Sequence, residues 1–356
     1  MRNEQKIVFV GMADGDEGQA PLGNLCREAD RLFVLTDENT QRLCLPILIK
    51  RYARELSEAA VITIAAGDTH KTLESCSHVW SELQRLGATR HSLLVCLGGG
   101  MVTDLGGFAA STFKRGLRFV NIPTTLLAMV DASIGGKTGI NFGGLKNEVG
   151  VFSNAATVVI DTRFLATLDS VNLRSGYAEM LKHGLLANDA MLARLLTFDI
   201  MAPDLAQLQL MVAESLQVKQ RIVSEDPTEQ GLRKALNLGH TIGHALESLA
   251  MQRQPVLHGY AVAWGLVSEL YLRVVKAGFP ADRLRQVAAF VSEHYGRMHF
   301  TCNDYPTLLE LMTHDKKNTA GTINFTLLGG VGDIRINQTA DKKEIEEALD
   351  FLREGC

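Results

Sequence analysis

The sequence lacks three features, each of which would indicate a different kind of protein. It has no Cys-x-x-Cys pair, no sustained run of lysine or arginine, and no apolar stretch long enough to span a membrane. With a net charge of −4, the chain has no electrostatic basis for binding nucleic acid or an anionic membrane. We therefore expect no nucleic-acid partner and no membrane partner.

The cysteines and the first residues indicate the compartment. Several of the six cysteines lie inside apolar runs, which is typical of buried thiols in a reducing environment. The opening residues lead into only a short apolar segment, so we expect no signal peptide. These features predict a cytoplasmic protein. The six are Cys26, Cys44, Cys76, Cys96, Cys302 and Cys356.

Hydrophobic periodicity divides the 356 residues into two parts, as the length also suggests. Residues 1–161 alternate short apolar segments with helical patterns, which predicts an α/β domain with a parallel sheet. Residues 162–356 show mainly helical patterns, so we expect a second, mainly helical domain and a cleft between the two. The strands expected in the first domain are Lys6–Val10, Arg31–Leu35, Ala60–Ile64, Ser92–Leu97, Arg118–Ile122 and Thr157–Ile160. In the second we expect strands near Thr322–Leu328 and Asp333–Ile336 and a last helix over Lys342–Arg353.

Three of the ten histidines lie close together, with Glu247 among them. If residues 237–250 form a helix, His240 and His244 are four apart on one face, the spacing at which two imidazoles reach one ion. His258 would then come from the next helix. A catalytic Zn²⁺ site needs three protein ligands and an open position, so a further ligand is required if one histidine serves another purpose. The alternative for each single histidine is an ordinary helix surface.

A glycine-rich turn follows the fourth expected strand. Gly98–Gly100 precede a helical pattern, and small residues there let backbone N–H groups approach a pyrophosphate at a helix N-terminus. The pattern is not a strict Gly-x-Gly-x-x-Gly, so a simple strand-to-helix turn remains the alternative. Asp37 and Asp68 also follow expected strands, where each is a ribose ligand or a helix N-cap, with the N-cap favoured for either one alone.

The string Gly-Gly-Lys-Thr that contains Lys137 resembles the end of a P-loop but does not complete that motif. A P-loop has a glycine separated by four residues from its Gly-Lys pair, and Asp131 occupies that position. This excludes nucleoside triphosphate hydrolysis of the P-loop kind. Lys137 and Lys146 lie nine residues apart in glycine-rich segments that we expect to be loops, where they would neutralise a phosphorylated substrate or cofactor.

Four segments together resemble the signature blocks of the 3-dehydroquinate synthase family, within the sugar phosphate cyclase superfamily. They are residues 97–113, 123–147, 175–182 and 237–258, and they follow the order of that family. The resemblance implies a dehydroquinate synthase-like fold, in which a Rossmann-like α/β N-terminal domain binds NAD and a mainly α-helical C-terminal domain binds a metal ion. It also implies an active site in the cleft and a homodimer.

The implied activity converts 3-deoxy-D-arabino-heptulosonate 7-phosphate, a phosphorylated sugar acid, into 3-dehydroquinate and phosphate. This is a step of the shikimate pathway to chorismate and the aromatic amino acids. The family mechanism combines transient oxidation by NAD, phosphate elimination, re-reduction and an intramolecular aldol reaction. The implied cofactors are NAD and Zn²⁺ or Co²⁺, and the donor set does not decide between the two metals.

The resemblance also assigns roles residue by residue. It gives the metal to Glu179, His240 and His258, and it gives His244 to the substrate. The implied catalytic residues are Arg115, Lys137, Asn147, Lys182 and His244. NAD contacts are expected from Asp37, Asn39, Asp68, Lys71, Gly99, Gly100, Met101, Asp104, Thr124, Thr125, Lys137, Lys146 and Thr167. Substrate contacts are expected from Arg115, Asp131, Lys137, Lys146, Asn147, Lys182, Lys219, Arg233, Asn237, His244 and Lys316, with Lys317 as the alternative to Lys316.

The sequence departs from the family pattern after the last expected ligand. Family members commonly read His-Gly-Glu there, whereas this chain has Tyr260 as the third residue, which is expected to change a group behind the metal ligand and retune metal affinity. Taken singly, Lys219 would be a solvated helix residue, Arg115 a surface charge and Asp131 an N-cap. The competing functions are another sugar phosphate cyclase, a metal- and NAD-dependent polyol dehydrogenase, and a metal-stabilised binding protein without activity.

Overall fold

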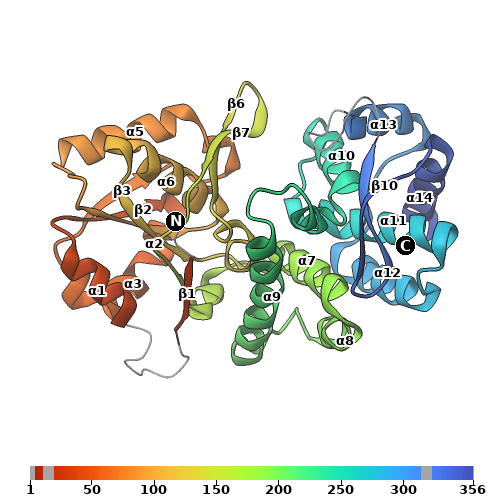
Figure 1. Cartoon of the computed structure of the whole chain (residues 1–356), viewed down its shortest axis with the longest axis horizontal. Coiled ribbons are helices and arrows are strands. Elements are labelled where there is room, and N and C mark those ends of the chain that lie inside the picture. Colours follow the sequence, from red (N-terminus) through yellow and green to blue (C-terminus); the bar gives the residue numbers. More distant parts are fainter. Residues whose placement is uncertain (1–4, 11–19, 314–322, 356) are drawn as a thin grey trace. The chain divides into compact units, whose positions relative to one another are not determined.

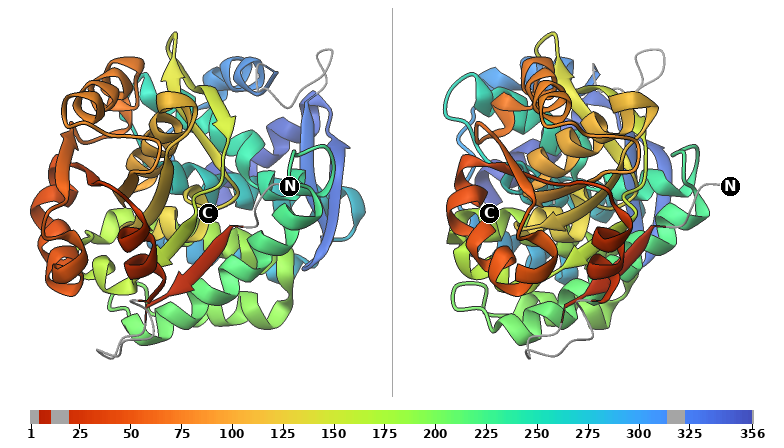
Figure 2. Two further views of the ribbon diagram at one scale, coloured as in Figure 1. Left: turned by 60° about the vertical axis from the view of Figure 1, so that its left-hand side comes forward. Right: turned by 90° about the vertical axis from the view of Figure 1, so that its left-hand side faces the viewer.

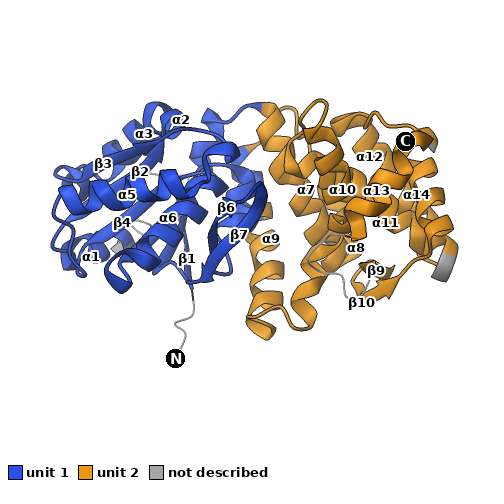
Figure 3. Cartoon of the chain, turned by 90° about the horizontal axis from the view of Figure 1, so that it is seen from above, with its two compact units in different colours: residues 1–169, 205–210 blue, residues 170–204, 211–356 orange. Residues whose placement is uncertain are grey.

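The computed structural model describes residues 5–10, 20–313 and 323–355. The chain forms two compact units, coloured separately in Figure 3. Unit 1 contains residues Met1–Asp169 and Leu205–Leu210, and unit 2 contains residues Ser170–Asp204 and Met211–Cys356. The division predicted from periodicity lay between residues 161 and 162.

Unit 1 is built on a six-stranded parallel sheet with the order β1-β8-β5-β4-β2-β3. Figure 1 labels β1, β2 and β3 of this sheet. All six predicted strands are present, with ends that differ by at most a few residues. The central strand β4 is buried along its whole length, as expected for a continuous apolar run covered on both faces. The strands are β1 (Lys6–Phe9), β2 (Leu32–Asp37), β3 (Ala60–Ile64), β4 (Leu93–Gly98), β5 (Arg118–Pro123) and β8 (Thr157–Ile160).

Helices join these strands, as the alternating pattern predicted. The α-helices of unit 1 are α1 (Ala20–Glu28), α2 (Glu38–Leu43), α3 (Leu45–Arg51), α4 (Ala53–Leu56), α5 (Leu73–Arg85) and α6 (Gly100–Thr112). Short 3₁₀ helices cover η2 (Asp68–His70), η3 (Phe113–Arg115) and η5 (Thr162–Thr167), and η4 (Ala128–Ala132) is a π-helix. Asp131 lies inside η4, so its interpretation as an N-cap is wrong.

Unit 1 also contains an antiparallel hairpin that was not predicted from the sequence. Strands β6 (Lys137–Phe142) and β7 (Leu145–Phe152) form a two-stranded ribbon, which projects in both views of Figure 2. Gly143 and Gly144 connect the strands with φ values of 60° and 82°. Positive φ at both central residues is the geometry of a tight hairpin turn, which glycine adopts without strain. Lys137 and Lys146 are therefore strand residues, and their expected place in loops is wrong.

Unit 2 is mainly helical, and together the two units confirm the predicted fold class. The predicted strand pair is present as β9 (Asn324–Gly330) and β10 (Asp333–Thr339), and the predicted last helix is α14 (Lys342–Gly355). No helix in the described ranges has the length and apolar character needed to cross a membrane. The other helices are α7 (Ser170–Ala187), α8 (Asp189–Thr197), α9 (Leu205–Glu225), η6 (Leu232–Asn237), α10 (His240–Met251), α11 (His258–Ala277), α12 (Ala281–Tyr295), η7 (Cys302–Asp304) and α13 (Tyr305–Thr313). The first six residues of α9 belong to unit 1, and η6 and η7 are 3₁₀ helices.

The helices that carry the predicted metal ligands pack closely. At the start of α11, a Cβ added to Gly259 would lie 1.8 Å from the carbonyl oxygen of Ser175 on α7. Between α10 and α11, a Cβ added to Gly243 would lie 2.9 Å from the carbonyl oxygen of Ala261. Because these positions have room only for glycine, the backbones of α7, α10 and α11 approach one another near His258 and His240.

Candidate functional site

The three clustered histidines and Glu179 meet in unit 2. His240 is the first residue of α10, His258 is the first residue of α11, and Glu179 lies in the buried middle of α7. The helix expected from residue 237 begins at His240, because Asn237 ends the preceding 3₁₀ helix. His240 and His244 still share one face of α10.

Distances define the cluster. The ring centroids of His240, His244 and His258 lie 5.2 to 5.7 Å apart, and the three residues offer nitrogens within 4.8 Å of one another. Glu179 Oε1 lies 3.4 Å from His240 Nε2 and 3.4 Å from His258 Nε2. Geometry thus offers two donor sets, the three histidines or Glu179 with His240 and His258.

Two contacts orient the rings that face Glu179. His240 Nδ1 lies 3.0 Å from the carbonyl oxygen of Leu238, and His258 Nδ1 lies 3.1 Å from Glu247 Oε2. With Nδ1 engaged, each ring presents Nε2 to the Glu179 carboxyl group. A carbonyl or carboxylate behind the ring is the usual support of a metal-bound histidine. The sequence places Glu247 in the cluster but does not indicate its role.

Burial and charge shift the pKa values of these groups. Burial alone would raise the pKa of the Glu179 carboxyl group, but the positive charge of Lys182 and the contacts with His240 hold it well below its usual value. Burial lowers the pKa of His240 to about 3, so its imidazole is neutral. Burial would also lower the pKa of His258, but its contacts with the carboxyl groups of Glu179 and Glu247 raise it to about 10.

The donor chemistry fits a divalent metal ion. Glu179 is fully buried, and within the described residues neither of its oxygens has a hydrogen-bond partner of normal geometry, although Lys182 Nζ forms an ion pair with Oε2. Since Lys182 pairs with Oε2, Oε1 is the oxygen whose burial is costly unless a further cation satisfies it. Two imidazoles and one carboxylate are a ligand set of catalytic zinc sites.

Unit 2 also buries three cations that were predicted to contact substrate. Lys182, Lys219 and Arg233 are 1%, 5% and 2% exposed. The expectation that Lys219 is a solvated helix residue is therefore wrong. Lys182 Nζ donates to the carbonyl oxygen of Leu236 at 2.9 Å, within the same 3₁₀ helix that carries Arg233 and Asn237. Lys182 is paired with Glu179, and a unit that buries several positive charges suits an anionic ligand.

The contacts that Asn237 and Tyr260 make were not predicted. Asn237 Nδ2 donates to Glu229 Oε1 at 3.3 Å, and Glu229 has a positive φ of 62°, which no sequence signal indicated. At the position of the family departure, the hydroxyl of Tyr260 accepts a hydrogen bond from Arg174 Nε at 3.0 Å. The ring of Tyr260 also packs edge-on against Tyr295, with 5.1 Å between centroids. Tyr260 therefore belongs to a polar and aromatic contact set beside His258.

In unit 1 the predicted cofactor residues form a network around Lys71. Its ammonium group donates to Asp104 Oδ2 and to Asn147 Oδ1, both at 2.5 Å. Lys146 Nζ pairs with Asp68 Oδ2 at 3.2 Å. Asp68 is the first residue of η2, whose N-cap is Gly67, so the N-cap interpretation of Asp68 is wrong. The hairpin β6–β7 thus brings Lys146 and Asn147 to the segment that follows β3.

The other predicted cofactor residues lie at the carboxyl ends of β2 and β4. These strands are neighbours, but the chain continues from β2 to β3 on one side and from β4 to β5 on the other. Parallel α/β sheets bind ligands at such a point, where the direction of the connections reverses. Asp37 ends β2 and caps α2 by accepting the N–H of Thr40 at 2.8 Å, which confirms its N-cap role. Gly99 is the N-cap of α6, and a Cβ there would lie 3.0 Å from Thr125 Cγ2. This crowded helix start fits the pyrophosphate of a dinucleotide.

The remaining predicted residues are placed as follows. Thr124 and Thr125 follow β5, and the hydroxyl of Thr167 lies 3.5 Å from Cys44 Sγ. Arg115 is exposed and has a positive φ of 68°, in agreement with a surface position. Asn39 is in α2, and Gly100 and Met101 begin α6. Lys316 and its alternative Lys317 lie outside the described residues.

Comparison with known proteins identifies the family. Residues 61–175 match the family model described as 3-dehydroquinate synthase N-terminal, and residues 176–318 match that described as 3-dehydroquinate synthase C-terminal. The chain is 55% identical to a 3-dehydroquinate synthase of Parabacteroides distasonis over 354 residues, 99% of each chain. It is 38% identical to one of Pseudoalteromonas atlantica, over 81% of this chain and 82% of the relative. The chain belongs to the 3-dehydroquinate synthase family.

Solved structures similar to this 3-dehydroquinate synthase family member agree in fold. One is ValA, a 2-epi-5-epi-valiolone synthase of Streptomyces hygroscopicus subsp. jinggangensis with NAD⁺ and Zn²⁺ bound. It is 26% identical, with a TM-score of 0.83 over 99% of this chain and 97% of that one. A 2-deoxy-scyllo-inosose synthase complexed with carbaglucose-6-phosphate, NAD⁺ and Co²⁺ is 23% identical, with a TM-score of 0.81 over 96% and 95%. The second likeness shows the fold alone.

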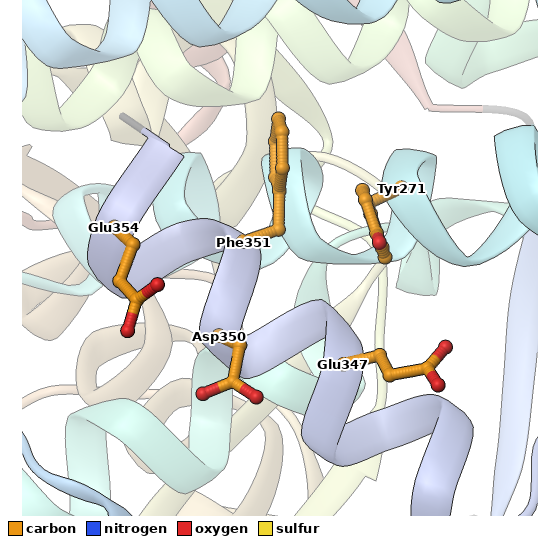
Figure 4. Close-up of a pocket in the computed structure, with 5 residues that line it drawn as sticks. All are labelled: Tyr271, Glu347, Asp350, Phe351 and Glu354. Carbon is orange, nitrogen blue, oxygen red and sulfur yellow. The ribbon is translucent and has the colours of Figure 1, made fainter.

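Unit 2 has a further surface hollow away from the predicted residues. Its volume is about 330 Å³, and it lies between α11 and α14 (Figure 4). Tyr271 stacks on Phe351 there, with 4.6 Å between ring centroids. Glu347 pairs with Lys343, and Asp350 pairs with Arg353. These two acidic groups at the hollow therefore already have partners in the protein.

Proposed function

We propose that this protein is a 3-dehydroquinate synthase, which converts 3-deoxy-D-arabino-heptulosonate 7-phosphate into 3-dehydroquinate and phosphate. The observation that carries the proposal is the buried Glu179 carboxyl group facing His240 Nε2 and His258 Nε2, in a unit that also buries Lys182, Lys219 and Arg233. A metal ligand set beside buried cations suits an alcohol substrate that also carries anionic groups. Similarity to the 3-dehydroquinate synthase of Parabacteroides distasonis supports the choice of substrate.

We propose Glu179, His240 and His258 as the metal ligands, because one Glu179 oxygen faces both imidazoles and each of these rings is oriented through Nδ1. His244 then remains beside the open position and contacts the substrate. When bound, the divalent ion would lower the pKa of a substrate hydroxyl group, and NAD⁺ would reversibly accept a hydride from the carbon atom that carries this hydroxyl. Zn²⁺ and Co²⁺ both suit this donor set.

The residues of unit 1 are proposed to hold NAD. Backbone N–H groups at Gly99, Gly100 and Met101 begin α6 and suit the pyrophosphate, because the helix N-terminus favours anions. Lys71 is fixed by Asp104 and Asn147 and presents a positive charge close to this edge of the sheet. Thr124, Thr125 and Thr167 supply hydroxyl groups, and Asp37 and Asn39 follow β2, where ribose contacts are expected.

The buried cations are proposed to bind the phosphate and carboxylate groups of the substrate. Fixed positive charges in a site that excludes water stabilise the anion that develops as phosphate leaves. Lys182, Lys219 and Arg233 would do this in unit 2, and Asn237 and His244 would donate hydrogen bonds to the sugar. Further substrate contacts are proposed from Arg115, Asp131, Lys137, Lys146 and Asn147 of unit 1, with Lys316 as another candidate.

The deciding experiment measures phosphate release from 3-deoxy-D-arabino-heptulosonate 7-phosphate by Zn²⁺-loaded protein with NAD⁺, while absorbance reports NADH. Phosphate release without NADH accumulation supports the synthase. Stable NADH from a simple alcohol would instead indicate a polyol dehydrogenase. Turnover of a different sugar phosphate in place of this one would indicate another cyclase.

Two further features are proposed with this function. Cys26, Cys44, Cys76 and Cys96 are buried free thiols, which suits the reducing environment of the cytoplasm. A homodimer is the state that the family resemblance implies, and sedimentation of the full chain tests it directly.

A further inference from the structure

Glu269 connects α11 to the first turn of α10. Its carboxyl group is fully buried, Oε2 accepts the N–H of Gly239 at 2.6 Å, and Oε1 accepts the N–H of Ile242 at 3.1 Å. Gly239 is the N-cap of α10, and Ile242 is its third residue. These are the two N–H groups that a capping box satisfies within one helix. Here a single side chain from a different helix accepts both.

The close approach of the two helices explains why the cap comes from α11. Gly239 has a φ of 78°, and a Cβ there would lie 2.8 Å from Leu266 Cγ, so a capping serine or aspartate has no room. On the other side of the contact, a Cβ added to Gly265 would lie 1.9 Å from the carbonyl oxygen of Gly239. Glu269 follows Gly265 by one helical turn and so lies on the face of α11 that meets the start of α10.

The anchored turn carries His240. This residue lies between the two amide groups that Glu269 accepts, and its Nε2 lies 3.4 Å from Glu179 Oε1. Zinc–nitrogen bonds are about 2.0–2.1 Å long and tolerate deviations of about 0.2 Å, so a small shift of this turn moves Nε2 out of range. We propose that Glu269 is a positioning residue for the metal site, which fixes the first turn of α10 and thereby places His240 Nε2. This inference rests on the proposed metal ligands.

His258 depends on different contacts. It begins α11, about three turns before Glu269, and its ring is held by Glu247 of α10. Loss of the Glu269 contacts is therefore expected to displace His240 and to leave the orientation of His258 in place. Helix α10 would thus supply His240 and, through Glu247, hold His258. Helix α11 would supply His258 and, through Glu269, hold the turn that carries His240.

The test compares Glu269→Gln with the wild-type chain and with Ser268→Ala. Glutamine has one acceptor oxygen and turns an amide NH₂ toward one of the two backbone donors. Ser268 is a matched control, because it is fully buried beside Glu269 but donates to Trp264 O within its own helix at 3.1 Å. The readouts are the Zn²⁺ dissociation constant by competition with a chromophoric chelator, the visible absorption of the Co²⁺-loaded protein, and circular dichroism.

We expect Glu269→Gln to remain folded, to bind Zn²⁺ about 10- to 100-fold more weakly, and to change the Co²⁺ absorption bands, while Ser268→Ala changes neither. A Glu269→Gln protein that melts at a lower temperature but keeps the wild-type Zn²⁺ affinity and Co²⁺ bands overturns the proposal, since Glu269 would then only cap α10. If Glu269→Gln does not fold, Glu269→Asp decides, because it keeps both acceptor oxygens on a side chain one methylene shorter. Weaker Zn²⁺ binding by the folded aspartate variant supports the proposal, and wild-type affinity overturns it.

Failure of the proposed function gives a different result. A wild-type chain that binds no Zn²⁺ overturns the metal site and this inference with it. A wild-type chain that binds Zn²⁺ but releases no phosphate from the proposed substrate overturns the function alone, and the comparison of the variants still decides the role of Glu269.

Discussion

Glu247 Oε2 lies 3.1 Å from His258 Nδ1, and this contact directs the opposite ring nitrogen toward Glu179. A carboxylate behind a metal-bound histidine fixes the ring and makes its free nitrogen a stronger donor. Helix α10 therefore supplies His240 to the proposed metal site and also orients the ligand that comes from α11.

Glu247→Gln is expected to weaken Zn²⁺ binding by about 10- to 100-fold, because a neutral amide supports the His258 ring less strongly. Chelator competition with the purified protein measures this. Glu293→Gln is the control, since Glu293 is exposed on α12 in the same unit. Equal Zn²⁺ affinity in the Glu247 variant and the wild-type chain would show that the contact has no part in metal binding.

Glu179→Gln is expected to abolish metal-dependent phosphate release and to weaken Zn²⁺ binding by at least about 100-fold, because it removes the only anionic donor of the proposed set. Chelator treatment of the wild-type chain should have the same effect, and added Zn²⁺ or Co²⁺ should restore the wild-type chain alone. Phosphate release and circular dichroism are the measurements. Turnover by metal-free protein contradicts the assignment.

Strands and the histidine cluster could be predicted because short-range pattern determines them. The strands of the six-stranded sheet are short and mainly apolar, and β4 is buried throughout. The spacing of His240 and His244 places both on one helix face without knowledge of the fold. Glu179 differs, since nothing in its own segment marks it, and only the family resemblance indicated it.

The remaining features depend on contacts between distant segments. Lys71 reaches Asn147 across 76 positions, and Glu269 reaches Gly239 across 30. No local pattern indicates such pairs, because tertiary packing brings them together. The hairpin of β6 and β7 did have a local signal in Gly143 and Gly144, but the nearby Gly-Gly-Lys string favoured a phosphate-binding loop instead.

Lys71→Met is expected to weaken NAD⁺ binding by about 10-fold or more, because it removes a charged donor and leaves Asp104 without that partner at the cofactor edge of the sheet. Calorimetric titration with NAD⁺ measures the dissociation constant. Lys50→Met is the control, since Lys50 is an exposed residue of α3. Unchanged NAD⁺ affinity would remove Lys71 from the cofactor site, and the Zn²⁺ affinity should stay constant in both variants.

Arg233→Lys is expected to lower kcat/KM for the phosphorylated substrate by about 10-fold or more. Arg233 is buried and donates through one guanidinium nitrogen to Pro227 O at 2.8 Å, and a lysine cannot reproduce the planar group of donors. Steady-state phosphate release gives kcat and KM. Wild-type kcat/KM in this variant would exclude Arg233 from substrate binding, provided that Zn²⁺ and NAD⁺ affinities are also those of the wild-type chain.

Asp304 gives a prediction for stability against pH that is separate from the proposed site. Its carboxyl group pairs with Arg253 and accepts the N–H of Thr301 at 2.8 Å, and the hydrogen bond from Arg253 is the main reason that the pKa of Asp304 lies below its usual value. Because the folded pKa is lowered, this stabilisation is fully present above the unfolded pKa of about 3.9 and is lost as pH falls through the folded value. Asp304→Asn is therefore expected to lower the melting temperature at pH 5 to 7, by an amount equivalent to about 1 kcal/mol of unfolding free energy. The difference in melting temperature from the wild-type chain should shrink only below about pH 4. Calorimetric melting across this range measures it, and a difference that grows as pH falls from 5 to 3 contradicts the assigned sign.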